Sequence, residues 1–180
     1  MQMTNEALKL FIMSLPNNSY FNIVSFGTGF EFLFRGQYAV PYTAKSRQEA
    51  LALITSFDAT FGGTEIAKPL SSCFSHGDSH KFTNRIFVLT DGAVARAQEV
   101  VDLVQKNSGL FQVHTFGVGS GCSKYLVAET ARAGRGTCSF IADGDNLKPK
   151  VVAALKKATS QSISGCQVEW FAAKSKTGVV

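Results

Sequence analysis

The residues Ile86–Val94, which read IFVLTDGAV, decide the fold of this chain. The four apolar residues at their start are typical of a strand buried on both faces, and Thr90-Asp91-Gly92 then leads the chain out of that strand. A pattern of helical spacing follows at Val94–Lys106. The same alternation of strand and helix patterns continues along the chain. Strands joined by helical crossovers predict an α/β fold, namely one doubly wound, mainly parallel sheet with helices on both faces.

Apolar periodicity and turn residues place the other elements. Helices are predicted at residues 4–15, 50–57, 123–133 and 147–155, with a short helix that includes Leu70 and Phe74; strands are predicted at 21–26, 30–34, 86–89, 113–118 and 137–141. A hairpin through Gly27-Thr28-Gly29 makes 30–34 a short antiparallel edge strand. The capping box Ser46-x-x-Glu49 predicts the start of the second helix. We predict one domain over residues 1–172 and a tail over 173–180. Cys166–Phe171 suggests a further strand that leaves the domain.

Composition limits the classes of partner. The chain has 180 residues, of which 45% are hydrophobic and 17% charged, so it can fold around a core of its own. Its net charge is +5, but lysine and arginine are scattered, and the lysines within Lys148–Lys157 have the helical spacing of a solvated face. We therefore predict no nucleic-acid partner.

The cysteines and the hydropathy pattern bear on location. The four cysteines form no C-x-x-C pair, and Cys138, inside a predicted strand, is expected to be a small core residue. No secretory leader follows Met1, and no apolar run has membrane-spanning length. We expect no membrane association and a reducing, cytoplasmic location.

Chemistry-bearing residues gather where strands end. In doubly wound sheets, ligands bind beyond the carboxyl ends of the strands, and three segments are predicted there: Ser25-Phe26-Gly27, Gly63-Thr64 and Thr90-Asp91-Gly92. The hydroxyl of Thr64 and the carboxylate of Asp91 are oxygen ligands of the kind that a hard divalent cation prefers. Each residue is also suited to capping the helix that follows it. Two ligands are too few to hold Mg²⁺ tightly, so a third loop is needed.

The same segments carry a family resemblance. The sequences GGTEI at 62–66, FVLTDG at 87–92 and TFGVGSG at 115–121 resemble a von Willebrand factor A domain. The sequence NSYFNIVSFGTGFEFLF at 18–34 is similar to the branch found in inter-α-trypsin inhibitor heavy chains and the vault-associated ADP-ribosyltransferase. The resemblance covers about residues 4 to 172, and its order and spacing are more specific than any one of its motifs.

The resemblance implies a Rossmann-like domain with a metal-ion-dependent adhesion site. In that site an Asp-x-Ser-x-Ser loop follows the first strand, and a Thr and an Asp from later loops complete it; these match Thr64 and Asp91. The metal keeps one position open for an acidic group of a partner protein. The implied function is therefore protein docking rather than catalysis.

The chain departs from the family pattern at its start. Asp-x-Ser-x-Ser occurs nowhere in the 180 residues, and Met1 lies inside the helix that follows this loop in the family. The family's first strand, which lies in the middle of the sheet, is missing as well. The chain is an N-terminally truncated fragment, or another chain or second copy supplies the strand, or the sheet closes in a reduced form without metal. We expect Mg²⁺ to bind only if the loop is supplied, and negligibly to the isolated chain.

Other motifs give weaker hypotheses. The turn Gly117–Gly121 suggests an alternative function, a small α/β nucleotide- or phosphate-binding enzyme, although it lacks the G-x-G-x-x-G spacing. His76, Asp78 and His80 are predicted to lie in an exposed loop, and His114 to be a satisfied core or edge histidine. No catalytic residues stand out. We predict a non-enzymatic protein-interaction module within a larger protein or assembly, or a pure scaffold in which Asp91 only caps a helix.

Overall fold

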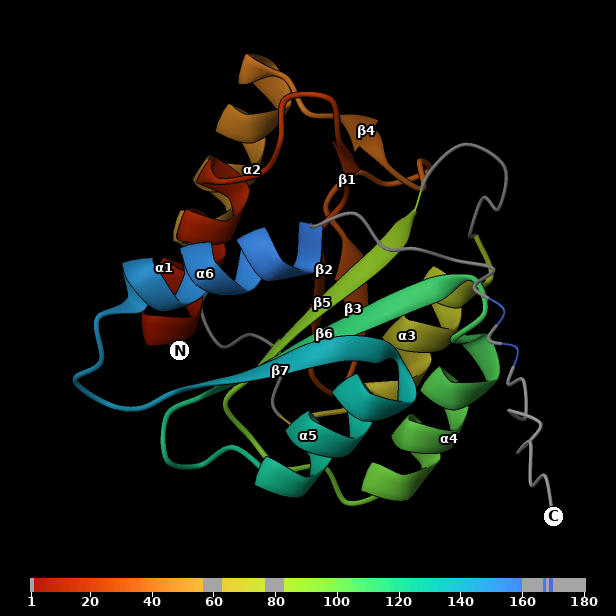
Figure 1. Cartoon of the computed structure of the whole chain (residues 1–180). Coiled ribbons are helices and arrows are strands. Elements are labelled where there is room, and N and C mark those ends of the chain that lie inside the picture. The colour runs from red at the N-terminus through yellow and green to blue at the C-terminus, as the bar shows by residue number, and fades with distance from the viewer. Residues whose placement is uncertain (1, 57–62, 77–82, 160–166, 168, 170–180) are drawn as a thin grey trace, which may run out of the picture.

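A computed structural model of the chain describes residues 2–56, 63–76, 83–159, 167 and 169 (Figure 1). The elements follow in the order α1 (Gln2–Met13), β1 (Tyr20–Phe21), β2 (Val24–Phe26), β3 (Phe30–Phe32), β4 (Val40–Pro41), α2 (Ala44–Ser56), α3 (Ala67–Phe74), β5 (Asn84–Thr90), α4 (Ala97–Asn107), β6 (Phe111–Val118), α5 (Lys124–Ala133), β7 (Arg135–Ile141) and α6 (Leu147–Thr159). The strand predicted at Cys166–Phe171 and the tail fall almost wholly outside the described residues.

The central sheet is parallel, as the sequence predicts. Its strand order is β5-β6-β7, and β5 pairs in register with β6 from Asn84 opposite Phe111 to Thr90 opposite Gly117. The pairing of β6 with β7 is also parallel, with an irregularity between Val113 and Thr115. The carboxyl ends of all three strands therefore open on one edge of the sheet, which we call the rim.

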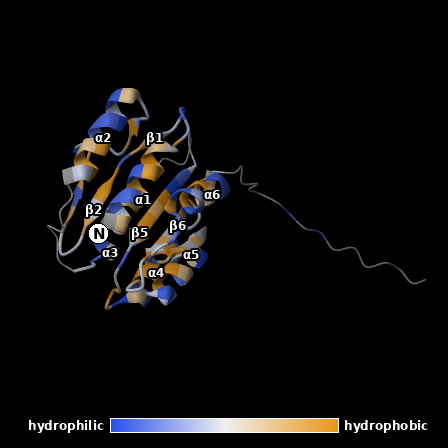
Figure 2. Ribbon diagram, turned by 90° about the vertical axis from the view of Figure 1, so that its left-hand side faces the viewer, coloured by the Kyte–Doolittle hydropathy of each residue, from blue (hydrophilic) through white to orange (hydrophobic). Residues whose placement is uncertain are grey.

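Helices cover both faces of this sheet (Figure 1). On one face α1 and α6 pack against β6, through a cluster that includes Phe11, Phe116 and Val151. On the other face α3, α4 and α5 pack around Val88 and Val113. Figure 2 shows the hydrophobic residues gathered on the strands and on the helix sides that face them. The predicted α/β architecture is confirmed.

The predicted strand 21–26 is interrupted, which corrects the sequence prediction. The side-chain amide of Asn22 donates to the carbonyl oxygens of Phe34, Gln37 and Tyr38, and its oxygen accepts the N–H of Phe34 at 3.1 Å. Because this side chain takes the place of a ladder partner, the backbone splits into β1, which pairs with β4, and β2, which pairs with β3. The predicted antiparallel hairpin is present in the β2–β3 pair.

The strand edges that stay open in the described part of the chain include one on β5 and one on β2. There β5 pairs with β6 alone, and β2 with β3 alone. The hairpin lies beside β5 (Figure 2), and Phe26 packs against the cluster that contains Val88. Helix α1 contacts both the central sheet and the N-terminal strands. Its Phe11 packs on Phe87 of β5, and its Ile12 belongs to a second hydrophobic cluster, which includes Phe21 of β1 and Val40 of β4. Most of β5 is only half-buried, in contrast to β6.

Two further sequence predictions are wrong in detail. Helix α2 begins at Ala44 rather than after Ser46, because Thr43 and Ser46 exchange hydrogen bonds: Thr43 N–H donates to Ser46 Oγ at 2.9 Å, and Ser46 N–H to Thr43 Oγ1 at 3.2 Å. Cys138 is exposed rather than in the core, because it lies on β7, the outer strand of the described sheet.

Candidate functional site

Four loops meet at the rim. The N–H of Glu65 donates to the carbonyl oxygen of Gly27 at 2.9 Å, which ties the loop before α3 to the β2–β3 hairpin. The N–H of Ser123 donates to the carbonyl oxygen of Gly92 at 3.4 Å, which ties the loop after β6 to the loop after β5. The backbone at Gly63 also lies close to the β2–β3 hairpin, because a Cβ at Gly63 would lie 3.2 Å from Thr28 Cγ2. The rim is thus held together by backbone contacts between loops that are distant in sequence.

The structure brings Thr64 to the backbone that follows Asp91. A Cβ placed on Gly92 would lie 2.9 Å from the Oγ1 atom of Thr64, so glycine is what lets this hydroxyl approach. The N–H of Gly92 donates to Thr90 Oγ1 at 3.4 Å, which holds the turn. Thr64 is half-buried and Asp91 is exposed. The Thr64 hydroxyl therefore lies beside the backbone that immediately follows Asp91.

Asp91 also meets the loop that follows β6. A Cβ on Gly121 would lie 3.0 Å from the backbone carbonyl oxygen of Asp91, so this position too accepts only a very small residue without rearrangement. The segment Ser25-Phe26-Gly27 contributes differently: Phe26 packs into the core, and Gly27 receives the bond from Glu65. Phe26 and Gly27 shape the rim rather than offer ligands to it.

The capping interpretations of Thr64 and Asp91 are wrong. The N-cap of α3 is Ile66 and that of α4 is Arg96, and neither helix has a side-chain cap hydrogen bond. Helix α4 begins at Ala97, three residues later than predicted, because the chain is irregular after Gly92 and Ala95-Arg96 form a turn. Neither the hydroxyl nor the carboxylate is used to start a helix.

The donor set suits a hard cation but is incomplete. Hydroxyl and carboxylate oxygens are ligands that Mg²⁺ accepts, usually together with several waters in an octahedron. Within the described residues, no group of three or more His, Cys, Asp or Glu side chains is placed to hold a metal ion. The pair Thr64 and Asp91 fits part of a metal site and needs further ligands.

The turn at Gly117–Gly121 is poorly suited to phosphate. Ser123 caps α5 and its Oγ accepts the N–H of Leu126 at 3.2 Å, so the helix N-terminus is already engaged. Gly119, at a φ of 74°, would place a Cβ 3.6 Å from the carboxylate oxygen Oδ1 of Asp143. A neighbouring carboxylate repels an anion. The geometry does not favour the nucleotide-binding alternative.

The two described histidines, His76 and His114, lie away from the rim. His114 is 3% exposed, and its Nδ1 accepts the N–H of Thr137 at 3.1 Å, which confirms a histidine in the core. Its Nε2 atom is buried without a hydrogen-bond partner among the described residues, so the prediction that this histidine is satisfied is wrong. Burial, and then the charge of Arg85, lowers the pKa of His114 to about 4. His76 is exposed, as predicted, and stacks on Tyr38 with ring centroids 5.9 Å apart. Asp78 and His80 lie outside the described residues.

The family model described as von Willebrand factor type A domain matches residues 1–140. This chain belongs to the von Willebrand factor type A family. It is 34% identical over 165 residues to the von Willebrand factor A domain-containing protein 5A of Rattus norvegicus, covering 92% of this chain and 20% of the relative. The chain thus spans a fifth of the length of that curated relative.

Solved von Willebrand A domains share the fold. The von Willebrand factor type A structure from Catenulispora acidiphila superposes with a TM-score of 0.75 at 20% identity, over 90% of this chain and 39% of that one. Proximal thread matrix protein 1 from the mussel byssus, whose metal-ion-dependent adhesion site holds zinc, gives a TM-score of 0.58 at 17% identity, over 86% and 41% of the two chains. Among the described residues no helix is both long and apolar enough to cross a membrane.

Proposed function

We propose that this domain is a protein-interaction module whose rim supplies two ligands, Thr64 and Asp91, to a metal-ion-dependent adhesion site. The observation that carries the proposal is the approach of the Thr64 hydroxyl to the Gly92 backbone, which brings a hydroxyl beside the residue that bears the carboxylate. Membership of the von Willebrand factor type A family supports it, as does the zinc at this site in the mussel protein.

The missing ligands would come with a strand between β2 and β5. Both strands end at the rim, because Gly27 and Asp91 follow them directly and the loops at these residues both meet the segment Gly63–Glu65. A strand lying parallel between them would therefore release its own carboxyl end at Thr64 and Asp91. We propose that a segment preceding this domain, or one from another chain, occupies this place and brings the Asp-x-Ser-x-Ser ligands.

In the completed site, the cation would hold an acidic side chain of the partner protein at its open position. The protein's own residues would bind and orient: Asp91 directly or through water, and Thr64 through its hydroxyl. Phe26 and Gly27 would shape the surface that meets the partner. No reaction is assigned to the site, and we propose a non-enzymatic role, in the cytoplasm, within a larger protein or assembly.

The test measures Mn²⁺ or Mg²⁺ binding by isothermal titration calorimetry in three samples. These are the chain alone, the chain with a synthetic peptide that joins an apolar strand to Asp-x-Ser-x-Ser, and the same mixture with Asp91→Ala. Of these three samples, only the second should bind the metal. The control is Asp102→Ala, which removes an exposed carboxylate from α4. Metal binding that survives Asp91→Ala would refute the proposal, as would equal loss in both variants.

A further inference from the structure

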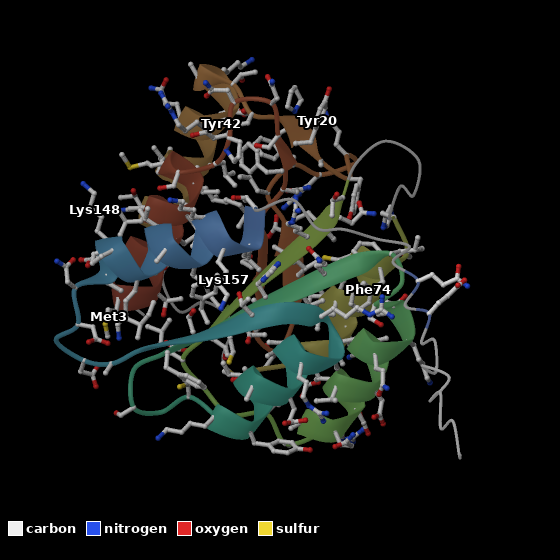
Figure 3. The ribbon with its side chains drawn as sticks, in the orientation of Figure 1. Met3, Tyr20, Tyr42, Phe74, Lys148 and Lys157 are labelled. Carbon is white, nitrogen blue, oxygen red and sulfur yellow. The ribbon has the colours of Figure 1, made fainter. Side chains whose placement is uncertain are left out.

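A groove runs between the edge strand β7 and the helix α6, along a different border of the sheet from the rim. Its volume is about 310 Å³, and its lining is Ser139, Phe140, Lys150, Ala153, Ala154 and Lys157. Figure 3 shows Lys157 in the space between α6 and β7, whereas Lys148 projects from the opposite end of the helix. The groove combines an apolar floor with two cationic borders.

The floor exposes apolar surface beside β7, whose outer edge has no paired strand in the described residues. Phe140 is 39% exposed, although it lies on a strand of the central sheet. The Nζ atom of Lys150 donates to the carbonyl oxygen of Phe140 at 3.1 Å and also pairs with the carboxylate of Asp145. In the described residues β7 pairs with β6 alone, so its outer edge offers backbone groups to an extended chain.

The charge of α6 is of one sign. All four charged residues in Leu147–Thr159 are lysines, and the helix carries no acidic residue. Lys150 and Lys157 lie seven residues apart, which places them roughly 10 Å apart along the helix axis. A segment with an apolar side chain between two carboxylates would match the floor and place one carboxylate at Lys157. Its other carboxylate would meet Lys150 and share that ammonium group with Asp145.

We propose that this groove docks an extended acidic segment of a partner protein with the pattern Glu-x-Leu-x-Glu. In an extended chain the first, third and fifth side chains share one face, and the two glutamates lie roughly 13 Å apart, within reach of flexible lysine side chains. The leucine then packs between Phe140 and Ala153. A protein segment fits better than nucleic acid, because the two lysines border an apolar groove and the other cations of the chain are scattered.

The test is fluorescence anisotropy with a labelled Thr-Glu-Thr-Leu-Thr-Glu-Thr peptide and the full chain, in EDTA. We expect saturable binding of the peptide to the unaltered protein. The substitution Lys157→Glu should weaken this binding by about tenfold or more. A peptide with Lys in place of one Glu should bind the Lys157→Glu variant with the affinity restored. The matched control Lys148→Gln, on the same helix but outside the groove, should change the affinity less than about twofold. Circular dichroism verifies that each variant is folded.

Several outcomes would overturn this inference. These are the absence of saturable binding, equal weakening by Lys157→Glu and Lys148→Gln, or displacement of the peptide at similar concentration by single-stranded DNA or by anionic vesicles. Because EDTA is present and Asp91→Ala should leave peptide binding unchanged, failure here is distinguishable from failure of the metal-site proposal at the rim.

Discussion

Acidification should destabilise this protein by an amount that belongs largely to His114. The ring is 3% exposed on β6 and stacks on Phe87 with ring centroids 5.1 Å apart. Its Nδ1 accepts the backbone N–H of Thr137, so the neutral ring carries its proton on Nε2. Protonation of Nδ1 would set two donors against each other and would charge a buried ring beside Arg85.

The magnitude follows from the pKa. Burial first, and then the charge of Arg85, lowers the pKa of His114 from 6.5 to about 4 in the folded protein. The unfolded chain therefore binds more protons between these two values, so stability is fully present above pH 6.5 and is lost as the pH falls toward 4. The total loss is roughly 3 kcal/mol, with a slope of about 1.4 kcal/mol per pH unit within the window.

Urea unfolding, followed by circular dichroism, measures this slope between about pH 7 and pH 5, a range in which most carboxylates stay ionised. The comparison variant is His114→Phe, which keeps an aromatic ring in the same place. It should be less stable at neutral pH by about 1–3 kcal/mol, because the N–H of Thr137 loses its acceptor. Its stability should nevertheless depend little on pH in this range. Parallel slopes for the two proteins would refute the argument.

Three other predictions concern the rim, a helix cap and the thiols. Gly92→Ala should lower the free energy of unfolding, measured in urea, by about 1–3 kcal/mol, because the new Cβ would lie 2.9 Å from Thr64 Oγ1. Adding Thr64→Ala should recover part of this loss. If the double variant recovers no stability, the contact is contradicted. Ser123→Ala should cost about 1 kcal/mol in the same assay, since its hydroxyl caps α5, and an unchanged midpoint would argue against the cap. In native protein at neutral pH, Cys138 should react with a disulfide reagent before Cys73, because Cys138 is exposed and burial raises the pKa of Cys73 to about 11; peptide mapping that finds Cys73 modified first would contradict this order.

The parallel sheet could be predicted because its signal is a property of single segments. A strand covered on both faces reads as a run of apolar residues, and Ile86–Leu89 and Val113–Val118 are such runs. The helices between them show apolar residues at helical spacing for the same reason. Burial against a neighbouring layer is thus recorded in each segment separately.

Details that depend on one side chain and a distant backbone could not be predicted. Asn22 divides the first strand because its amide bonds to carbonyl groups 12 to 16 residues away. Thr43 and Ser46 cap α2 although Ser46-x-x-Glu49 fits the capping pattern, because both pairs satisfy the same spacing rule. Cys138 looks like a core residue in sequence, but its exposure depends on what lies beyond β7.

Part of the candidate site could likewise be predicted from the sequence, and part of it depends on tertiary contacts. That Asp91 lies at the rim follows from the parallel direction of the strands, which the sequence predicts. Thr64 reaches the rim on the loop before α3, so its place depends on how that loop packs. That the hydroxyl reaches the Gly92 backbone is a tertiary contact, and glycine at that position is its only trace in the sequence. The groove beside α6 could not be predicted from the sequence. Lys150 and Lys157 have the spacing of a solvated face, and only the packing of α6 beside β7 shows the apolar floor between them.

The open strand edges and the incomplete ligand set have a single geometric origin. Within the described residues β5 has an unpaired edge and most of its side chains are only half-buried, which favours the addition of a strand whether or not a metal is present. Because β5 ends at Thr90, directly before Asp91, a parallel strand added there would also end at the rim. Ligands on the loop after that strand would then meet Thr64 and Asp91 without further rearrangement of the domain. Under the proposed function, strand addition and metal binding are therefore coupled, and each must strengthen the other by the same factor.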